Sequence, residues 1–243
     1  MRLGQVQEAS GVPPTDSTLA LLLVAAALLL AGRAWLAENP QHDPTAPLDL
    51  RDERGWATQA KLMSLLGDVE ACRAVLDRSE VAYTALEPAG EDQCYRGDRT
   101  VLDTSELSPR QAPVTCPVAV GYELWVEKDL RPLAREILGS DIAGIRQLGT
   151  YSCRRMYGAN SGPWSEHATG NAIDIAGFTL EDGRTISLLG GWNGDEDERA
   201  FLRAARDAAC DNFGTVLSPD YNAAHADHFH LDQGRSPGMG ACR

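Results

Sequence analysis

The chain opens with an apolar run that constrains the fold more than any other feature and lies apart from the rest of the sequence. Residues 19–32 are small or apolar without interruption, LALLLVAAALLLAG, and residues 34–37 extend the run beyond Arg33. A secretory signal needs an apolar region of about 7–15 residues, whereas a membrane span needs about 17–25. The longer length is reached only if Arg33 lies at the interface with its charge turned to water. Because no small-x-small cleavage site follows cleanly, we expect residues 1–37 to be an uncleaved anchor, with a cleaved signal as the alternative.

The cysteines indicate the compartment of the remaining chain. All of them lie beyond the apolar run, at Cys72, Cys94, Cys116, Cys153, Cys210 and Cys242. None forms the Cys-x-x-Cys pair of a zinc ribbon or thioredoxin-type site, and an even number downstream of an export signal indicates structural disulfides. We expect Cys72 and Cys94 to be the local pair, because both precede the expected catalytic core. The location that follows is the periplasmic face of the cell envelope, with the protein anchored to the membrane rather than secreted.

Charge and composition exclude some partners. The chain carries 22 Lys and Arg against 35 Asp and Glu, a net charge of -13, so no nucleic-acid partner is expected, since phosphate backbones require clustered basic side chains. Hydrophobic residues make up 43% of the chain, enough for a folded core. Residues 38–55 are rich in proline and charge and are interpreted as a tether, and residues 56–243 as the folded domain.

Hydrophobic periodicity predicts a mixture of helices and strands in the domain. The expected helices cover residues 57–66, 68–76, 117–138, with a break near Arg131 and Pro132, and 195–213. The expected strands cover residues 81–86, 142–154, 172–178 and 227–232. No regular βαβ alternation is present, so we expect an α+β fold.

Most residues with special chemistry lie in two segments, and the first is residues 165–174, SEHATGNAID. Successive side chains of a strand point to opposite faces. A strand over residues 172–178 therefore turns Ile173 and Ile175 toward the core and Asp174 to the other face. The small neighbours of Asp174 on that face leave room for a ligand.

The second segment is residues 227–232, DHFHLD. As a strand it places His228, His230 and Asp232 on one face, so that two imidazoles and several carboxylates converge. Asp232 either orients a ligand histidine or only solvates the strand end. The nearby His225 is interpreted as a surface residue or a neighbour of the ligands rather than a fourth ligand.

Two histidines and a carboxylate form a donor set that suits catalytic zinc. His167, Asp174 and His230 would supply three protein ligands and leave a position for water. A His-x-His pair by itself is a weak signal, so spacing alone leaves the metal site open.

The motif around these residues resembles a known superfamily. The pattern Ser-x-His-x-x-Gly-x-Ala-x-Asp followed by a His-x-His strand resembles the zinc D-Ala-D-Ala carboxypeptidases, which are grouped with lysostaphin-type endopeptidases and the hedgehog signalling domain. It is matched here at Ser165, His167, Gly170, Ala172 and Asp174. Closer still is the resemblance to bacterial proteins with an extensin-like C-terminal domain, carried by residues 151–155, 164–175, Cys210 and 218–232. It covers roughly residues 72–243. It implies a mainly antiparallel sheet flanked by helices, as in hedgehog and D,D-peptidase domains, with the peptidase-like core at about 140–243.

The resemblance also implies roles for single residues. His167, Asp174 and His230 match the zinc ligands, and Ser165 and Arg154 match positions that contact substrate in relatives, although Arg155 is an adjacent alternative. The general base is either His228, which we favour, or Asp227. The function implied is an exported zinc metallopeptidase that hydrolyses peptide or amide bonds of cell-wall peptidoglycan. The alternative is a zinc-stabilised module that binds the wall or a partner without turnover.

Overall fold

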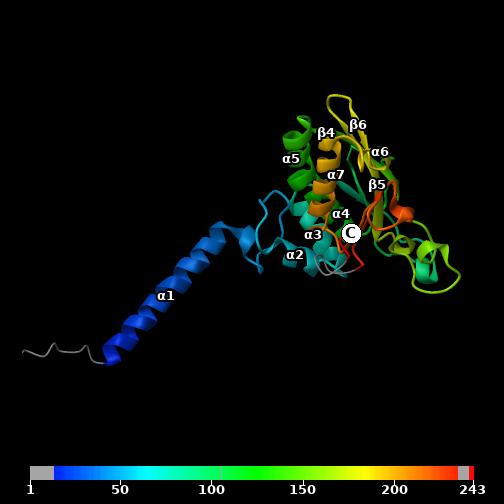
Figure 1. The fold of residues 1–243 in the computed structure, drawn as a ribbon. Helices are drawn as coiled ribbons and strands as arrows, with labels where there is room; N and C mark the ends of the chain where they lie inside the picture. The colour runs from blue at the N-terminus through cyan, green and yellow to red at the C-terminus, as the bar shows by residue number, and fades with distance from the viewer. Residues whose placement is uncertain (1–13, 105, 235–240) are drawn as a thin grey trace, which may run out of the picture.

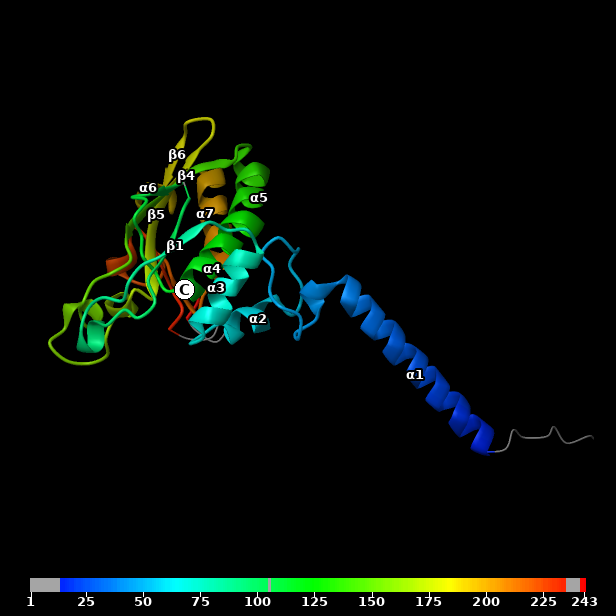
Figure 2. The same ribbon diagram turned by 180° about the vertical axis from the view of Figure 1, so that it is seen from behind.

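The computed structural model describes residues 14–104, 106–234 and 241–243. Pro14–Glu38 form α1, a single helix that projects from the folded body (Figures 1 and 2). Within it, Ser17–Glu38 is long and apolar enough to cross a membrane, and this stretch is not buried inside the protein. The expected N-terminal apolar helix is therefore present, although residues 1–13 of the expected anchor lie outside the described residues.

The segment expected to be a tether lies against the body. After the short helix η1 (Pro40–His42), the side chains of Leu48 and Leu50 are buried. The backbone N–H of Leu50 donates to Ser79 Oγ at 2.8 Å, and the Arg78 guanidinium donates to the carbonyl oxygen of Leu48 at 3.1 Å. These contacts hold residues 48–50 on the surface of the body.

The helices of the body are α2 (Thr58–Ser64), α3 (Val69–Arg78), α4 (Cys116–Trp125), α5 (Arg131–Leu133), α6 (Leu188–Gly191) and α7 (Glu196–Ala209). The side chain of Asp68 caps α3 by accepting from the backbone N–H of Ala71. Three acidic residues occupy the first turn of α7, where they complement the helix dipole. The helix expected over residues 195–213 therefore begins as predicted and ends four residues early.

The helical segment that contains Pro132 does not break. The chain stays helical from Cys116 to Leu138, through two wide π-helical turns, η3 (Val126–Leu130) and η4 (Ala134–Leu138), on either side of α5. Proline has no N–H to donate and its ring crowds the preceding turn. Widening the turns around Pro132 accommodates that ring, so the expected break is replaced by a local change of helix type.

Two sheets complete the fold. β1 (Tyr83–Ala85) and β2 (Thr100–Leu102) form an antiparallel pair. The main sheet has the order β3 (Leu107–Ser108), β4 (Ile142–Gly149), β5 (Ala172–Leu180), β8 (Phe229–Asp232) and β7 (Thr215–Leu217), and β6 (Thr185–Ser187) pairs with the far end of β5. Only the β3–β4 pair is parallel among the described strands. The predicted α+β class with a mainly antiparallel sheet is confirmed.

The core lies between the main sheet and the helices α4 and α7 (Figure 1). The indole of Trp125 packs edge-on against Phe178 of β5 and against Phe213, and Phe178 packs in the same way against Phe201 of α7. The Trp125 indole N–H is satisfied by the carbonyl oxygen of Ala205 at 2.9 Å. This packing fixes β5 in place, and β5 is the strand that carries part of the candidate site.

All four predicted strands are present, with different limits. The strand expected over residues 81–86 is the shorter β1 at residues 83–85, and the strand expected over residues 172–178 is the longer β5 at residues 172–180. The strand expected over residues 142–154 ends at Gly149, and the chain then forms a loop that contains Cys153. The strand expected over residues 227–232 begins at Phe229, so His228 lies just before it.

All six cysteines form disulfides, but the expected pair Cys72–Cys94 is wrong. The pairs are Cys72–Cys116, Cys94–Cys153 and Cys210–Cys242, with Cα–Cα distances of 6.0, 5.6 and 5.8 Å. Cys72 lies on the buried side of α3, where it meets the first residue of α4. Cys94 lies instead in the short helix η2 (Asp92–Cys94) and reaches the loop after β4. Tertiary packing, rather than proximity in sequence, decides the partners.

Candidate functional site

Three side chains of the predicted ligand set come from three neighbouring elements. His167 lies on the short helix η6 (Glu166–Thr169), which Ser165 caps by accepting the backbone N–H of His167 at 3.3 Å. Gly170 ends that helix with a φ of 74°, a conformation that favours glycine. Asp174 of β5 is paired directly with His230 of β8.

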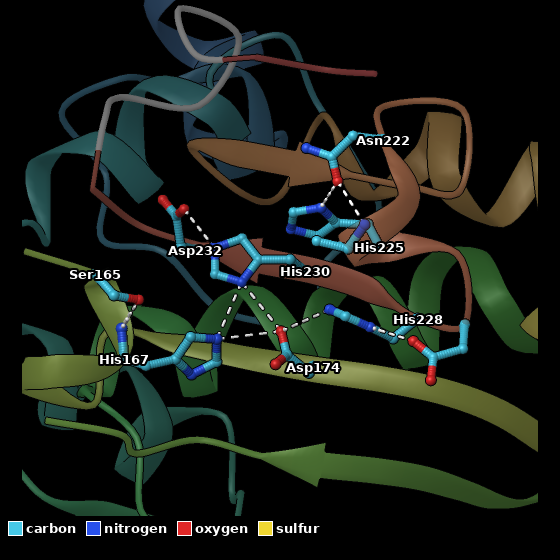
Figure 3. Close-up of polar contacts among 10 residues, drawn as sticks. Ser165, His167, Asp174, Asn222, His225, His228, His230 and Asp232 are labelled. Atoms are coloured by element: carbon cyan, nitrogen blue, oxygen red, sulfur yellow. Dashed lines mark hydrogen bonds and ion pairs between the residues drawn. The ribbon is translucent and has the colours of Figure 1, made fainter. Parts of the chain in front are cut away.

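The donor atoms of these residues meet at one point (Figure 3). His167 Nε2 lies 3.2 Å from Asp174 Oδ1 and 3.0 Å from His230 Nδ1, and His230 Nδ1 lies 3.0 Å from the same Asp174 oxygen. All three side chains are largely buried, with exposed fractions of 5% for His167, 17% for Asp174 and 12% for His230. The structure therefore brings together the three residues that the motif singles out.

Asp232 determines which nitrogen of His230 faces this point. Asp232 Oδ2 lies 2.9 Å from His230 Nε2, and a carboxylate can only accept, so Nε2 carries the hydrogen. The protonated ring also donates from Nδ1 to the Asp174 oxygen, whereas the neutral ring that keeps its hydrogen on Nε2 has the lone pair of Nδ1 directed at the centre of the cluster. The hydrogen bond from His230 to Asp232 fixes the orientation of the His230 ring, which is the contact that the first of the two roles left open by the sequence requires.

The carboxylate and the histidines of the cluster shift each other's pKa values. Burial opposes ionisation of Asp174, but hydrogen bonds from His167 and His230 outweigh it and hold its pKa well below the usual range. Burial also opposes protonation of His230, but its hydrogen bonds to Asp174 and Asp232 prevail and raise its pKa to about 9. At neutral pH the cluster thus pairs an ionised Asp174 with a protonated His230, and a metal ion bound at Nδ1 would take the place of that proton.

The donor triangle fits a small divalent metal ion. Tetrahedral zinc with bonds of about 2.0–2.2 Å places neighbouring ligand atoms about 3.3–3.6 Å apart. The three separations here are slightly shorter, and a small outward movement of each side chain would match them. Two imidazole nitrogens and one carboxylate oxygen are a donor set that zinc accepts while one coordination position stays open.

His228 and Asp227 form a pair beside the triangle. His228 Nδ1 lies 2.8 Å from Asp227 Oδ1, and His228 Nε2 lies 3.7 Å from Asp174 Oδ1. Because the Asp227 carboxylate accepts from Nδ1, the neutral His228 ring keeps the lone pair of Nε2 directed at the cluster (Figure 3). The Asp227 side chain is 54% exposed, whereas that of His228 is 13% exposed.

His225 lies beside the cluster and is not a surface residue, so it matches the second of the two interpretations of the sequence, a neighbour of the cluster. It is buried, and its ring centroid lies 5.2 Å from that of His228 and 5.9 Å from that of His230. Its Nδ1 lies 2.8 Å from Asn222 Oδ1. Burial, reinforced by the neighbouring histidines, lowers its pKa to about 4, so His225 is held neutral at neutral pH.

A cavity of about 380 Å³ opens over the cluster. Ser165 and Arg154, the two expected substrate contacts, both line it. Arg155 does not line the cavity, because its guanidinium stacks on the Trp164 ring at 4.7 Å from the centroid and donates to the carbonyl oxygen of Gly162. Of the two arginines, Arg154 is therefore the one that lines the cavity.

Two tyrosines line the cavity. The sequence left open whether Tyr221 lines a cleft or only packs, and it gave no sign of Tyr157. Tyr157 and Tyr221 belong to different loops, and their hydroxyl oxygens lie 3.4 Å apart. Asn222 Nδ2 also donates to the Tyr157 hydroxyl at 3.3 Å. A single tyrosine in a loop carries no distinctive pattern, and only the folded arrangement shows that the pair bridges the cavity wall.

The fold and the site together define the class: an α+β protein with a buried two-histidine, one-carboxylate cluster at the floor of an open cavity. The family described as Extensin-like protein C-terminus matches residues 70–243, and the chain belongs to this family. A search of curated proteins and a search of solved structures found no match.

Proposed function

We propose that this protein is an exported, zinc-dependent hydrolase that acts on peptide or amide bonds of cell-wall peptidoglycan. The observation that carries the proposal is the convergence of His167 Nε2, Asp174 Oδ1 and His230 Nδ1, 3.0–3.2 Å apart, at the floor of a cavity large enough for a peptide end. The motif resemblance to zinc D-Ala-D-Ala carboxypeptidases supports the same chemistry. The apolar helix α1 and the three disulfides support an exported, membrane-attached location.

Zinc would be held by the two histidines and Asp174, where it supplies Lewis acidity toward a water molecule and toward the scissile carbonyl group. Asp232 holds His230 in the tautomer that leaves Nδ1 free to bind the metal. The η6 turn, capped by Ser165, fixes the position of His167.

His228 is the residue to which we assign proton transfer. Its Nε2 accepts a proton from the attacking water as the water oxygen bonds to the carbonyl carbon. It then returns a proton to the leaving nitrogen as the carbon–nitrogen bond breaks. Asp227 holds the ring by accepting from Nδ1. The two residues between which the sequence left the base open thus act as a base and its orienting partner.

Arg154 and Ser165 are the proposed substrate contacts. A guanidinium binds a carboxylate through two parallel hydrogen bonds, which suits a peptide that ends in a free carboxylate. Arg154 is free to do so, since its described contact is a single 3.2 Å bond from Nε to Ser152 Oγ, within its own loop.

The test combines metal analysis with a digest of wall peptides. The purified full chain in detergent is incubated with muropeptides with and without a chelator, the products are identified by mass spectrometry, and zinc content is measured. We expect one zinc per chain and hydrolysis that stops with the chelator and returns with zinc. His230→Ala should lose both metal and turnover, whereas His228→Ala should keep zinc and lose most turnover.

Two further variants sharpen the test. His42→Ala is the matched control, because His42 belongs neither to the donor cluster nor to the lining of the cavity, so its removal should leave zinc content and turnover unchanged. If Asp227→Ala abolishes turnover while His228→Ala does not, the assignment of the base is wrong. If the wild-type protein binds zinc and wall peptides but cleaves none of them, the binding-module alternative replaces this proposal.

A further inference from the structure

The junction between α1 and the body contains an aromatic cluster that plays no part in the candidate site. The Trp35 ring stacks on the His42 ring, with centroids 5.2 Å apart and planes 15° from parallel. The Trp56 ring lies 4.6 Å from His42 and 5.7 Å from Trp35. The end of the apolar helix α1 and the start of the body thus contribute to one aromatic cluster. We call it the junction cluster (Trp35, His42 and Trp56).

Both indoles of the junction cluster face solvent rather than the core. Trp56 is 72% exposed and Trp35 is 42% exposed. The three other tryptophans differ: Trp125 and Trp192 are buried, and Trp164 lies beside the cavity. Large exposed aromatic rings in a protein body indicate a contact with something outside it.

The junction cluster is held rigidly by the body. The Trp56 indole N–H donates to the carbonyl oxygen of His42, and the Trp56 backbone N–H donates to His42 Nδ1 at 3.3 Å. Lys61, only 4% exposed, donates to the carbonyl oxygen of Pro40 at 2.6 Å. The exposed rings therefore do not lie on a free linker: the end of α1 is bound to the surface of the body at this point.

The length of α1 identifies what lies against the cluster. The apolar stretch Ser17–Glu38 has 22 residues and spans about 33 Å at a rise of about 1.5 Å per residue. This length matches a hydrocarbon layer of about 30 Å. Trp35, in the last turn of that stretch, then falls at the boundary between hydrocarbon and water, where tryptophan is enriched in membrane proteins. Trp56 and His42 lie beside it at the same level.

We infer that the junction cluster is a membrane seat: Trp35, His42 and Trp56 lie in the headgroup layer of a lipid bilayer and hold the body against its surface. The seat determines orientation as well as attachment. Figures 1 and 2 show the loop at residues 150–165, which borders the cavity, on the opposite side of the body from α1. With the seat in the headgroups, the loop that borders the cavity lies on the side of the body away from α1 (Figures 1 and 2). This inference concerns the junction alone and stands whether or not the cavity is hydrolytic.

Depth-dependent quenching of tryptophan emission tests the seat. The full chain is reconstituted in vesicles of phosphatidylcholine with a minority of phosphatidylglycerol, with bromine either close to the headgroups or at the chain ends. We expect the shallow bromines to quench part of the emission and the deep bromines to quench less. The double variant Trp35→Phe/Trp56→Phe should lose more than half of the quenched component.

The matched control is Trp164→Phe, which removes an indole on the far side of the body and should retain the full quenched component. The two seat residues are exposed, so phenylalanine should leave the fold intact, and far-ultraviolet circular dichroism on heating verifies this. Quenching that survives the double variant, or vesicle-bound protein whose tryptophans are not quenched at all, overturns the inference. So does N-terminal sequencing that finds the membrane-bound chain beginning beyond Trp35. In that last case the exposed face of Trp56 has another partner.

Discussion

Glu123 on α4 provides a quantitative test of the packing described above. Burial raises the pKa of its carboxyl from the usual 4.5 to about 7. The nearby Glu127 and Glu106 reinforce this effect, and Arg131 opposes it. The ionised form is therefore disfavoured in the folded protein. Because the unfolded chain releases this proton at lower pH than the folded chain, stability falls as pH rises from about 4.5 to about 7 and the loss is complete above that range.

The magnitude follows from the two pKa values. Each unit of pKa difference corresponds to about 1.4 kcal/mol, so the cost above about pH 7 is up to about 3 kcal/mol. Glu123→Gln keeps the shape of the side chain and removes the charge. We expect the variant to match the wild type near pH 4 and to exceed it by up to about 3 kcal/mol near pH 8.

Urea unfolding of the full chain in zwitterionic detergent, followed by tryptophan emission between about pH 4 and pH 8, measures this difference. Taking the difference between variant and wild type cancels the titration of all other groups. Glu136→Gln is the control, because Glu136 lies in the same helical segment but is exposed. A Glu123→Gln effect that is independent of pH, or equal to that of the control, would refute the reasoning.

Three other predictions follow from contacts at the site and in the body. Asp232→Asn weakens the orientation of His230 and should reduce zinc affinity about 10–100-fold, measured by competition with a chromogenic chelator, while wild-type affinity in the variant would contradict the role of Asp232. Digestion without reductant should yield the three disulfide-linked peptide pairs found here and no Cys72–Cys94 link. Replacing Cys94 and Cys153 by serine should cost about 4 kcal/mol of stability in urea unfolding, from a loop of 59 residues.

The sequence was most informative where a pattern repeats over many residues. The apolar face of residues 195–213 predicted α7, and the alternation around Asp174 predicted β5 with Ile173 and Ile175 buried. The convergence of His167, Asp174 and His230 was predicted from a motif rather than from geometry. The structure then showed that β5 and β8 pair directly opposite each other at Asp174 and His230.

Contacts that depend on tertiary packing could not be predicted from the sequence. The partner of Cys72 is fixed by the contact of α3 with α4, which no local pattern records. The hydrogen bond between Asp227 and His228 depends on side-chain rotation just before β8. The contact of Tyr157 with Tyr221 joins loops that are 64 residues apart. Each of these concerns which residues meet, whereas hydrophobic periodicity only indicates which residues turn inward.

The candidate site is sensitive to the register in which β5 pairs with β8. Asp174 faces His230 only because Ile173 pairs with Leu231 and Ile175 with Phe229 on the buried side of the same strands. A slip of one residue along either strand would turn Asp174 or His230 to the opposite face. Substitutions among these apolar residues can therefore separate Asp174 from His230 while leaving every polar residue of the candidate site in the sequence. Mutations that disrupt such a site can therefore lie in its apolar side chains.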